Sequence, residues 1–344
     1  MTQRYEEVVR NLTAPGAPFE IVTEAVRGRP MKTFKNRERS LRDKITAAAA
    51  RGDVDFLVQG DRRVTYGAFA RQVWGAARAL THDHGLAKGD RVAILSYNCP
   101  DWIIALFGAT SAGGIGVGLN GWWATEEIEY GLVDSGSRFL VVDERLFPRV
   151  APLLGKIGGL ERIFYIGADA PGGTVPIAEL IEPHDEPPTV AIDEDDPFVI
   201  LYTSGTTGRS KGCITTHRGT IAQVTGILFV NIVNAALAGG RSLLPPSGNQ
   251  PASLLTSPLF HVGGLHSIVC TQMTIGAKLV FNQGRFDAEE VMQQALHTLH
   301  ATHQAAPSKV QECQEAAARI RELCQGVTLG GLNIKELIHE GHKY

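Results

Sequence analysis

The chain has 344 residues, of which 44% are hydrophobic and 20% charged, and its formal net charge is −3. This composition is typical of a soluble globular protein, and the length predicts two or more packed subdomains. Lysine and arginine are scattered along the chain, and the net charge is small, so we do not expect a nucleic-acid-binding protein.

Short β-branched runs alternate with helical patterns over most of the chain. We expect strands at RVAIL, GGIGVGL, FLVVD, RIFYIG and PFVILY, with helices between them, and a last amphipathic helix at FDAEEVMQQALHTLH. The stretch from Pro171 to Asp196 is rich in Pro, Gly and acids and indicates a surface connection. This alternation predicts an α/β fold with mainly parallel sheets flanked by helices.

Helix starts are also readable. Ser40 is expected to cap a helix that runs through Ala50, with Asp43 as its acidic first-turn partner. Thr65 precedes another helical pattern, and Pro100 opens a further helix as a first-turn proline.

A helix with an acidic first turn is expected after Thr125, which serves as its cap. No capping box is expected there, because Ile128 holds the position that needs Glu or Gln. This helix should stop near Gly136, and a further helix is expected from about Leu146 to Leu154.

Two uncharged runs approach the length of a membrane span. The first, Trp102 to Leu119, contains five glycines and is better explained as a helix, a turn and a short strand. The second, Gly219 to Gly240, carries Gln223, Asn231 and Asn234, which are costly in lipid. We therefore expect no transmembrane span, and peripheral contact with a membrane stays open.

The cysteines and the N-terminus indicate the compartment. The five cysteines are an odd number without Cys-x-x-Cys spacing, which favours free thiols in a reducing compartment. The first residues, MTQRYEEVVRNL, lack the apolar core of a signal peptide. We expect a cytoplasmic protein.

The most informative stretch is LYTSGTTGRSKGCITTHRG, Leu201 to Gly219. It follows the buried-strand pattern PFVILY, and ligands of α/β sheets bind beyond the carboxyl ends of strands. Its glycines let backbone N–H groups approach an anion, its Thr and Ser hydroxyls donate hydrogen bonds, and Lys211 supplies a charge suited to phosphate. The combination predicts a polyphosphate-binding loop, and a flexible linker is the less favoured alternative.

This loop is not a Walker loop, which needs Gly-Lys-Ser/Thr leading into a helix. Here Ser210 precedes Lys211, Gly212 follows it, and CITT has the pattern of a second strand. We expect a strand–loop–strand hairpin over the phosphates.

TSGTTGRSKG resembles the phosphate-loop signature of the adenylate-forming superfamily, which includes acyl-CoA synthetases, with Ser210 where the family usually has Pro. The segments TYGAFARQVWGAARAL, GLAKGDRVAILSYNCPDWIIALFGATSAGG and SPLFHVGGLHS are similar to acyl-CoA synthetases as well. The resemblance covers roughly Arg39 to His300. It implies the large N-terminal domain of these enzymes at 39–300, with subdomains 39–185 and 186–300, after an N-terminal extension at 1–38.

The resemblance implies a two-step reaction. A carboxylic acid, most readily a fatty acid, attacks the α-phosphate of ATP, and coenzyme A then takes the acyl group, with Mg²⁺ as the metal. Phosphate-binding residues implied by the motif are Thr203, Ser204, Gly205, Thr206, Thr207, Gly208 and Lys211. Thr203 is also a candidate magnesium contact, and His261 is the candidate catalytic residue at the carboxylate end of the acyl pocket. A hydrogen-bonded structural histidine is the alternative for His261.

Two other clusters have simpler explanations. His297, His300 and His303 recur every third residue, but such steps drift around a helix and no Cys or carboxylate completes a zinc site. The acidic run Asp193 to Asp196 is interpreted as a solvated charged linker and not as a metal cluster.

The family pattern is lost after His300. Its Tyr-Gly-x-Thr-Glu motif, ribose-binding Asp and C-terminal domain with a catalytic Lys are not found intact, and residues 301–344 are expected to form a divergent helical tail. GVTLGGLNIKE is a weak match to the magnesium motif, with Glu336 at the Glu position. An internal loss between Thr302 and Pro307 would explain the shortening.

Three hypotheses follow. The chain is a shortened acyl-CoA synthetase with impaired activity, or it is a nucleotide- or acyl-binding module without catalysis. In the third, it is half of an enzyme, completed by a partner chain.

Overall fold

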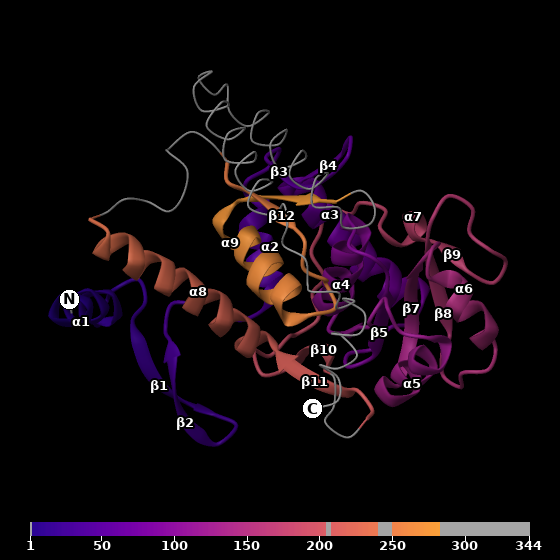
Figure 1. The fold of residues 1–344 in the computed structure, drawn as a ribbon, viewed down its shortest axis with the longest axis horizontal. Helices are drawn as coiled ribbons and strands as arrows, with labels where there is room; N and C mark the ends of the chain where they lie inside the picture. Colours follow the sequence, from indigo (N-terminus) through magenta and orange to yellow (C-terminus); the bar gives the residue numbers. More distant parts are fainter. Residues whose placement is uncertain (1, 204–207, 240–249, 283–344) are drawn as a thin grey trace, which may run out of the picture. The chain divides into compact units, whose positions relative to one another are not determined.

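The computed structural model describes residues 2–203, 208–239 and 250–282 (Figure 1). The large unit spans Met1–Tyr202 and Gly212–Gln283, whereas Thr203–Lys211 belongs to a second unit and is described by itself. The expected helix at 286–300, the three histidines from His297 to His303, Glu336 and the 301–344 tail lie outside the described residues.

A seven-stranded sheet in the order β11-β10-β6-β5-β7-β8-β9 forms the larger of two main sheets. From β10 to β9, every neighbouring pair is parallel. The parallel sheet expected from the βα alternation is therefore confirmed. Its strands are β5 (Arg91–Leu95), β6 (Ile115–Gly118), β7 (Ser137–Asp143), β8 (Arg162–Ile166), β9 (Val175–Pro176), β10 (Pro197–Thr203) and β11 (Lys211–Thr216).

Both faces of this sheet are buried, and the alternation of side chains along the strands shows how. In β5, Val92 and Ile94 belong to one core cluster, while Ala93 and Leu95 belong to another. The first cluster includes α3 (Tyr66–Arg78) and α4 (Pro100–Ser111), and the second includes residues of α5 (Thr125–Ser135). Every residue of α4 is buried, and its one charged residue, Asp101, is ion-paired with Arg62 at 2.6 Å, so its largely apolar sequence reflects a core helix.

A second sheet has four strands in the order β12-β13-β3-β4. β12 and β13 are parallel, β13 and β3 are parallel, and β3 and β4 are antiparallel. Its strands are β3 (Asp55–Gln59), β4 (Arg62–Thr65), β12 (Ala252–Leu255) and β13 (Lys278–Phe281). A separate antiparallel hairpin is formed by β1 (Ile21–Val26) and β2 (Arg29–Phe34).

Among the remaining described helices, the longer ones are α1 (Thr2–Thr13), α2 (Leu41–Ala49) and α8 (His217–Leu237). The short ones are α6 (Phe147–Val150), α7 (Ile177–Leu180) and α9 (Thr271–Ile275). The segments η1 (Ala79–Asp83) and η3 (Gly263–Cys270) are π-helical, and η2 (Ala151–Leu153) is a 3₁₀ turn. The stretch expected as a surface connection, Pro171 to Asp196, thus contains β9 and α7.

Two helix starts test the capping predictions. Ser40 caps α2 through a reciprocal box with Asp43, whose backbone N–H lies 3.1 Å from Ser40 Oγ and whose carboxylate accepts from Ser40 N–H at 2.9 Å. The prediction for α5 was wrong by one residue. Ala124 is the cap position, and Glu127 accepts a hydrogen bond from its N–H at 2.8 Å. The Thr125 hydroxyl instead donates to the carbonyl of Arg149.

The first uncharged run is α4, a turn and β6, as expected. The second contains α8, which is long and apolar enough to cross a membrane by length and composition alone. Of its most apolar 18-residue window, 28% is buried, and Val230 and Ile232 are exposed. Such a single helix is weak evidence for a span.

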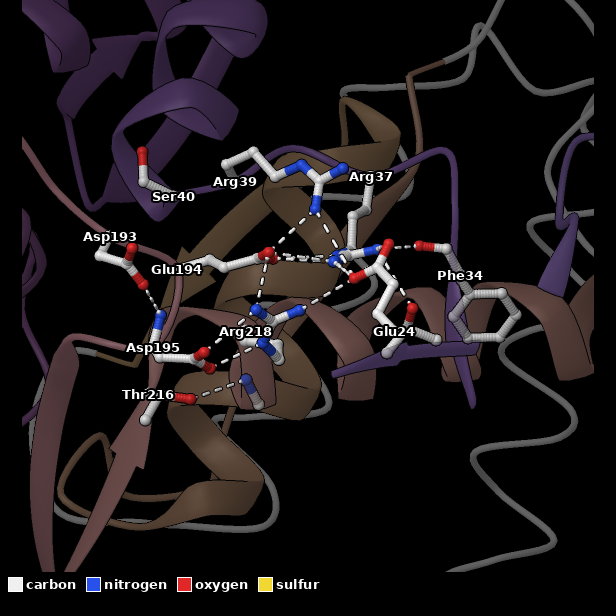
Figure 2. Close-up of polar contacts among 12 residues, drawn as sticks. Glu24, Phe34, Arg37, Arg39, Ser40, Asp193, Glu194, Asp195, Thr216 and Arg218 are labelled. Carbon is white, nitrogen blue, oxygen red and sulfur yellow. Dashed lines mark hydrogen bonds and ion pairs between the residues drawn. The ribbon is translucent and has the colours of Figure 1, made fainter. Parts of the chain in front are cut away.

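A cluster of ion pairs links the β1–β2 hairpin to the start of α8 and to the acidic run before β10 (Figure 2). Arg37, with 2% of its side chain exposed, contacts Glu24 at 2.6 Å and Glu194 at 3.0 Å. Arg218 contacts Glu194 at 2.8 Å and Asp195 at 2.6 Å. The interpretation of this run as a solvated linker was therefore wrong, because Glu194 and Asp195 are ion-pair partners.

Candidate nucleotide- and acyl-binding site

The carboxyl ends of the parallel strands define one edge of the seven-stranded sheet, where α/β proteins bind their ligands. Thr203 ends β10, the segment Ser96–Asn98 follows β5, and Asp143 ends β7. Asp143 is buried and accepts hydrogen bonds from the N–H groups of Tyr97 at 2.7 Å and Leu146 at 2.9 Å. This carboxylate therefore ties together the turns that follow two neighbouring strands.

The segment Thr203–Lys211, which carries the phosphate motif, connects β10 to β11, its neighbour in the sheet. The expected second strand after Lys211 is thus confirmed. Thr203 Oγ1 lies 3.4 Å from the carbonyl oxygen of Lys211, and Gly208 has φ +89°, a backbone conformation that favours glycine. Ser204, Gly205, Thr206 and Thr207 lie outside the described residues.

Lys211 is exposed, and none of the described residues accepts a hydrogen bond or ion pair from its ammonium group. A lysine in this state offers its full charge to an anionic ligand, because no partner has to be displaced. The next residue, Gly212, packs tightly: a Cβ there would lie 2.9 Å from Ile200 Cγ2. The backbone directly after Lys211 is therefore held close to β10.

His261 lies in a turn between Pro258 and Leu265. Its N–H donates to the carbonyl of Pro258 at 3.2 Å, and its carbonyl accepts from Leu265 N–H at 3.0 Å. Its Nδ1 accepts from Gly263 N–H at 3.3 Å, which assigns the proton of the neutral ring to Nε2. The side chain is exposed, so Nε2 is available as a hydrogen-bond donor to a ligand.

Asn98 holds this turn at the carboxyl edge of the sheet. Its Nδ2 donates to the carbonyl of Ser257 at 2.9 Å, and its Oδ1 accepts from Leu259 N–H at 2.9 Å. The sequence interpretation did not single out Asn98; the available signal was a polar residue following a buried strand. Both ends of one amide are used, which fixes the position of the turn.

Packing fixes the same turn against β6. A Cβ on Gly118 would lie 3.0 Å from Phe260 Cα and 2.9 Å from Leu201 Cδ2, so glycine lets the turn approach the strand end. The Phe260 ring contacts Trp122 edge to face at 5.5 Å, and 70% of Trp122 is exposed. The turn that carries His261 thus adjoins the ends of β6 and β10.

A buried polar pair lies behind this turn. His266 Nδ1 is 3.2 Å from Gln223 Oε1 of α8, and Gln223 Nε2 donates to Ser267 Oγ at 3.1 Å. His266 is 1% exposed, and burial lowers its pKa to about 4. It is therefore neutral near pH 7 and acts as a structural group that connects η3 to α8.

The metal prediction rests on few protein groups. Among the described residues, no three His, Cys, Asp or Glu side chains gather in a way that could hold a metal ion. Thr203 is described, whereas Glu336 is not. Mg²⁺ commonly keeps waters and binds substrate phosphates with only one or two protein ligands, so a sparse oxygen set at Thr203 fits an ion carried by a nucleotide.

Comparison with known proteins identifies the class. The family model described as "AMP-binding enzyme" matches residues 45–330. The chain belongs to this family, and the resemblance to adenylate-forming enzymes is confirmed.

Among curated relatives, a feruloyl-CoA synthase from Amycolatopsis sp is 31% identical over 233 residues, covering 68% of this chain and 41% of the relative. The long-chain-fatty-acid–CoA ligase FadD13 of Mycobacterium tuberculosis is 30% identical over 232 residues, covering 67% of this chain and 42% of the relative. The chain therefore spans about two fifths of the length of these relatives.

Solved structures agree on the fold. A putative long-chain-fatty-acid CoA ligase from Rhodopseudomonas palustris matches with a TM-score of 0.63 and 25% identity, covering 81% of this chain and 66% of that structure. The N-terminal domain of FACL13 from Mycobacterium tuberculosis matches with a TM-score of 0.61 and 27% identity, covering 76% of this chain and 61% of that domain. The described fold is that of the N-terminal domain of adenylate-forming enzymes.

Proposed function

We propose that this chain binds ATP and a carboxylic acid, and takes part in their conversion to an acyl-adenylate that coenzyme A then consumes. The observation that carries the proposal is the phosphate motif at the carboxyl end of β10, with Lys211 exposed and unpaired among the described residues. The family supports ATP and coenzyme A as substrates. Nucleotide binding and turnover together distinguish the three hypotheses of impaired ligase, binding module and half-enzyme.

In the first step, a carboxylate oxygen attacks the α-phosphorus of ATP. The bond from that phosphorus to the oxygen bridging to the β-phosphate breaks, and pyrophosphate leaves with the electron pair. The β- and γ-phosphates would be held by Thr203, Gly208, Lys211 and the residues between them. The Lys211 ammonium would stabilise the negative charge of these phosphates. In the second step, the coenzyme A thiolate attacks the acyl carbon and AMP leaves.

His261 would contact the carboxylate end of the acid. Because Nδ1 of His261 accepts a hydrogen bond from Gly263 N–H, the ring proton lies on Nε2, which leaves Nε2–H as the donor for a ligand. A donor placed beside a reacting carboxylate orients it for attack. Mg²⁺ would be carried on the phosphates, with the Thr203 hydroxyl as the candidate protein oxygen.

The acid itself is proposed to be a fatty acid, with an aryl acid as the alternative. The relatives carry both names, feruloyl-CoA synthase and long-chain-fatty-acid–CoA ligase. Free thiols at Cys99 and Cys270 support a reducing compartment, which we propose to be the cytoplasm.

The test combines binding and turnover. ATP binding is measured by calorimetry, and pyrophosphate release and acyl-CoA formation are measured with a panel of fatty and aryl acids. We expect Lys211→Ala to weaken ATP binding by about tenfold or more, because a charge-assisted phosphate contact is lost. The matched control is Lys156→Ala. Lys156 is exposed, and its side chain has no hydrogen-bond or ion-pair partner among the described residues.

The outcomes separate the hypotheses. ATP binding with acyl-CoA formation supports the ligase, and ATP binding without turnover supports the binding module. Turnover that appears only with a second polypeptide supports the half-enzyme. Equal ATP affinity of the Lys211→Ala and Lys156→Ala variants would contradict the proposal.

A further inference from the structure

A groove of about 490 Å³ lies in the large unit, away from the carboxyl edge of the sheet. Its walls come from the end of α3, from η1, from the residue after α4, and from the segment His184–Val190. Along the chain, η1 precedes β5, Ala112 precedes β6, and Val190 precedes β10. Since these strands are parallel, the groove lies at the amino edge of the sheet, opposite the edge where the phosphate motif begins.

The segment His184–Val190, which forms one wall of the groove, is held in place near both of its ends. At one end, His184 N–H donates to the carbonyl of Arg71 at 2.9 Å, and Glu182 sits so close to α3 that a Cβ on Gly75 would lie 1.7 Å from its carbonyl oxygen. At the other end, the carbonyl of Val190 accepts from Arg42 Nη1 at 2.8 Å. A wall anchored in this way gives a pre-formed site, which is the usual state of small-molecule pockets.

Exposed or partly exposed hydrogen-bond donors gather along the groove. Arg78 and His82, about one helical turn apart, both line it, and neither side chain has a hydrogen-bond or ion-pair partner among the described residues. His184 Nδ1 lies 3.2 Å from both the N and the O of Glu186, which leaves Nε2 to face other groups. A ligand rich in acceptor oxygens would satisfy these donors.

Trp74 adds a flat apolar surface to the same groove. It lines the groove, is 5% exposed, and no acceptor for its indole N–H is found among the described residues. An indole in a groove with cationic and neutral donors suits a ligand that combines an oxyanion with an apolar or aromatic part. Glu186 also lines the groove, and its carboxylate disfavours ligands with several negative charges.

The local backbone supports a binding role. η1 is a π-helical segment, and it places Thr81 and His82 in the groove directly after α3. π-Helical segments are rare and are found frequently at functional sites. The other π-helical segment among the described residues, η3, begins two residues after His261.

We infer that this groove is a second binding site, distinct from the nucleotide edge, for a small organic anion with one phosphate or carboxylate headgroup and an apolar body. Arg78 and His82 would bind the headgroup, and Trp74 would pack against the body. This assignment does not depend on the proposed ligase function, because it uses residues of the opposite edge.

Tryptophan indole signals test the site directly. The chain has four tryptophans, so the ¹⁵N-labelled protein gives four indole N–H signals, assigned with Trp74→Phe, Trp122→Phe and Trp123→Phe, which leaves the fourth signal to Trp102. Trp74 reports on the groove, exposed Trp122 reports on the carboxyl edge, and fully buried Trp102, whose indole N–H has no partner among the described residues, reports on folding. The probes are phenyl phosphate for the phosphate arm, benzoate for the carboxylate arm, and inorganic phosphate for the headgroup alone.

We expect phenyl phosphate or benzoate to shift the Trp74 signal saturably while the Trp122 signal stays in place, and inorganic phosphate to bind more weakly. Arg78→Gln should weaken binding by about tenfold, because a charged hydrogen-bond donor is lost. Arg71→Gln, about two helical turns earlier on α3 and outside the groove, should change it by less than about twofold. Glu186→Gln should tighten binding by about two- to fivefold, because a nearby like charge is removed.

Three results would overturn the inference. The first is a Trp74 signal that stays in place with all probes. The second is a shift that is equal in the wild type and the Arg78→Gln variant, with the Trp102 signal confirming that the variant is folded. The third is weaker binding in Glu186→Gln, which would indicate a cationic or zwitterionic ligand.

Discussion

Asn98 and Leu259 lie 161 positions apart in the chain, and a 2.9 Å hydrogen bond from Leu259 N–H to Asn98 Oδ1 joins them. The same amide donates to the carbonyl of Ser257. The Asn98 side chain, which follows β5, therefore supplies both a donor and an acceptor to the backbone of the turn before His261. This relationship places a local turn and a distant strand end in a fixed geometry.

Removal of this amide should destabilise the turn. Asn98→Ala leaves the N–H of fully buried Leu259 and the carbonyl of Ser257 without their partner, and we expect the free energy of unfolding to fall by about 1–3 kcal/mol. Urea denaturation measures this change. Asn36→Ala, which removes one exposed contact to Ala17, is the control and should cost less than about 0.5 kcal/mol. Equal losses in both variants would show that Asn98 does not support the turn.

Close packing at the end of β6 gives a second prediction. A Cβ added by Gly118→Ala would meet the backbone of Phe260 at 3.0 Å, and backbone does not move aside easily, so a loss of about 1–3 kcal/mol is expected. Gly226→Ala in α8 has no neighbouring atom within 4 Å and should be stabilising by up to about 1 kcal/mol. Thermal unfolding of the two variants compares them. A Gly118→Ala variant as stable as the wild type would contradict the packing argument.

Two buried histidines predict how stability depends on pH. Burial lowers the pKa of both His217 and His266 to about 4, whereas the unfolded chain takes up these protons near pH 6.5. Between these values the unfolded state binds more protons, so stability is complete above about pH 6.5 and falls as the pH decreases towards 4. At pH 5 the expected loss is about 2 kcal/mol per histidine.

Urea denaturation between pH 7 and about pH 5 measures this effect separately from the carboxylates. Glu24 and Asp195 titrate lower, because hydrogen bonds from Arg37 and Arg218 lower their pKa values. His266→Leu should remove about half of the loss, since one of the two titrating groups is gone. A wild-type stability that is constant over this range would show that folding does not lower the pKa of either histidine.

The ion-pair cluster predicts unequal effects for two neighbouring arginines. Arg37→Met removes the most buried partner of Glu24 and Glu194, although both carboxylates keep Arg218, and a loss of about 1–3 kcal/mol is expected. Arg39, which contacts Glu194 at 2.9 Å but has 51% of its side chain exposed, should contribute less than about 1 kcal/mol. Unfolding of Arg37→Met and Arg39→Met in urea makes the comparison, and similar losses would contradict it.

The parts of the fold that the sequence predicted are those with local causes. Ser40 and Asp43 are three residues apart and cap α2 through contacts that need no distant group. Buried runs such as RVAIL identified β5, and their alternation with helices identified the parallel sheet. The cap of α5 was misplaced because Thr125 matched the preferred residue type, while Ala124 holds the cap position and Glu127 binds its backbone.

Local sequence patterns could not predict contacts between residues that are far apart in the chain. The acidic run 193–196 gives no sign in one sequence that Glu194 faces Arg37, because the two lie 157 positions apart. Asn98 has the same character, since only folding brings Ser257 and Leu259 to it. For the candidate site, the sequence named Lys211 and His261, and the roles of both stay predictions that the binding and turnover experiments decide.

The cluster around Arg37 also has a consequence for how the protein is made. Ribosomes add about 5–20 residues per second, so Glu194 emerges roughly 10–30 s after Arg37. The β1–β2 hairpin can pair with itself early, because its strands are adjacent in sequence. During that interval Arg37 has Glu24 but not Glu194, and its guanidinium remains in water until the strands that precede α8 have been synthesised. The β1–β2 hairpin is thus translated well before Glu194 and Arg218, the residues that complete its ion-pair cluster.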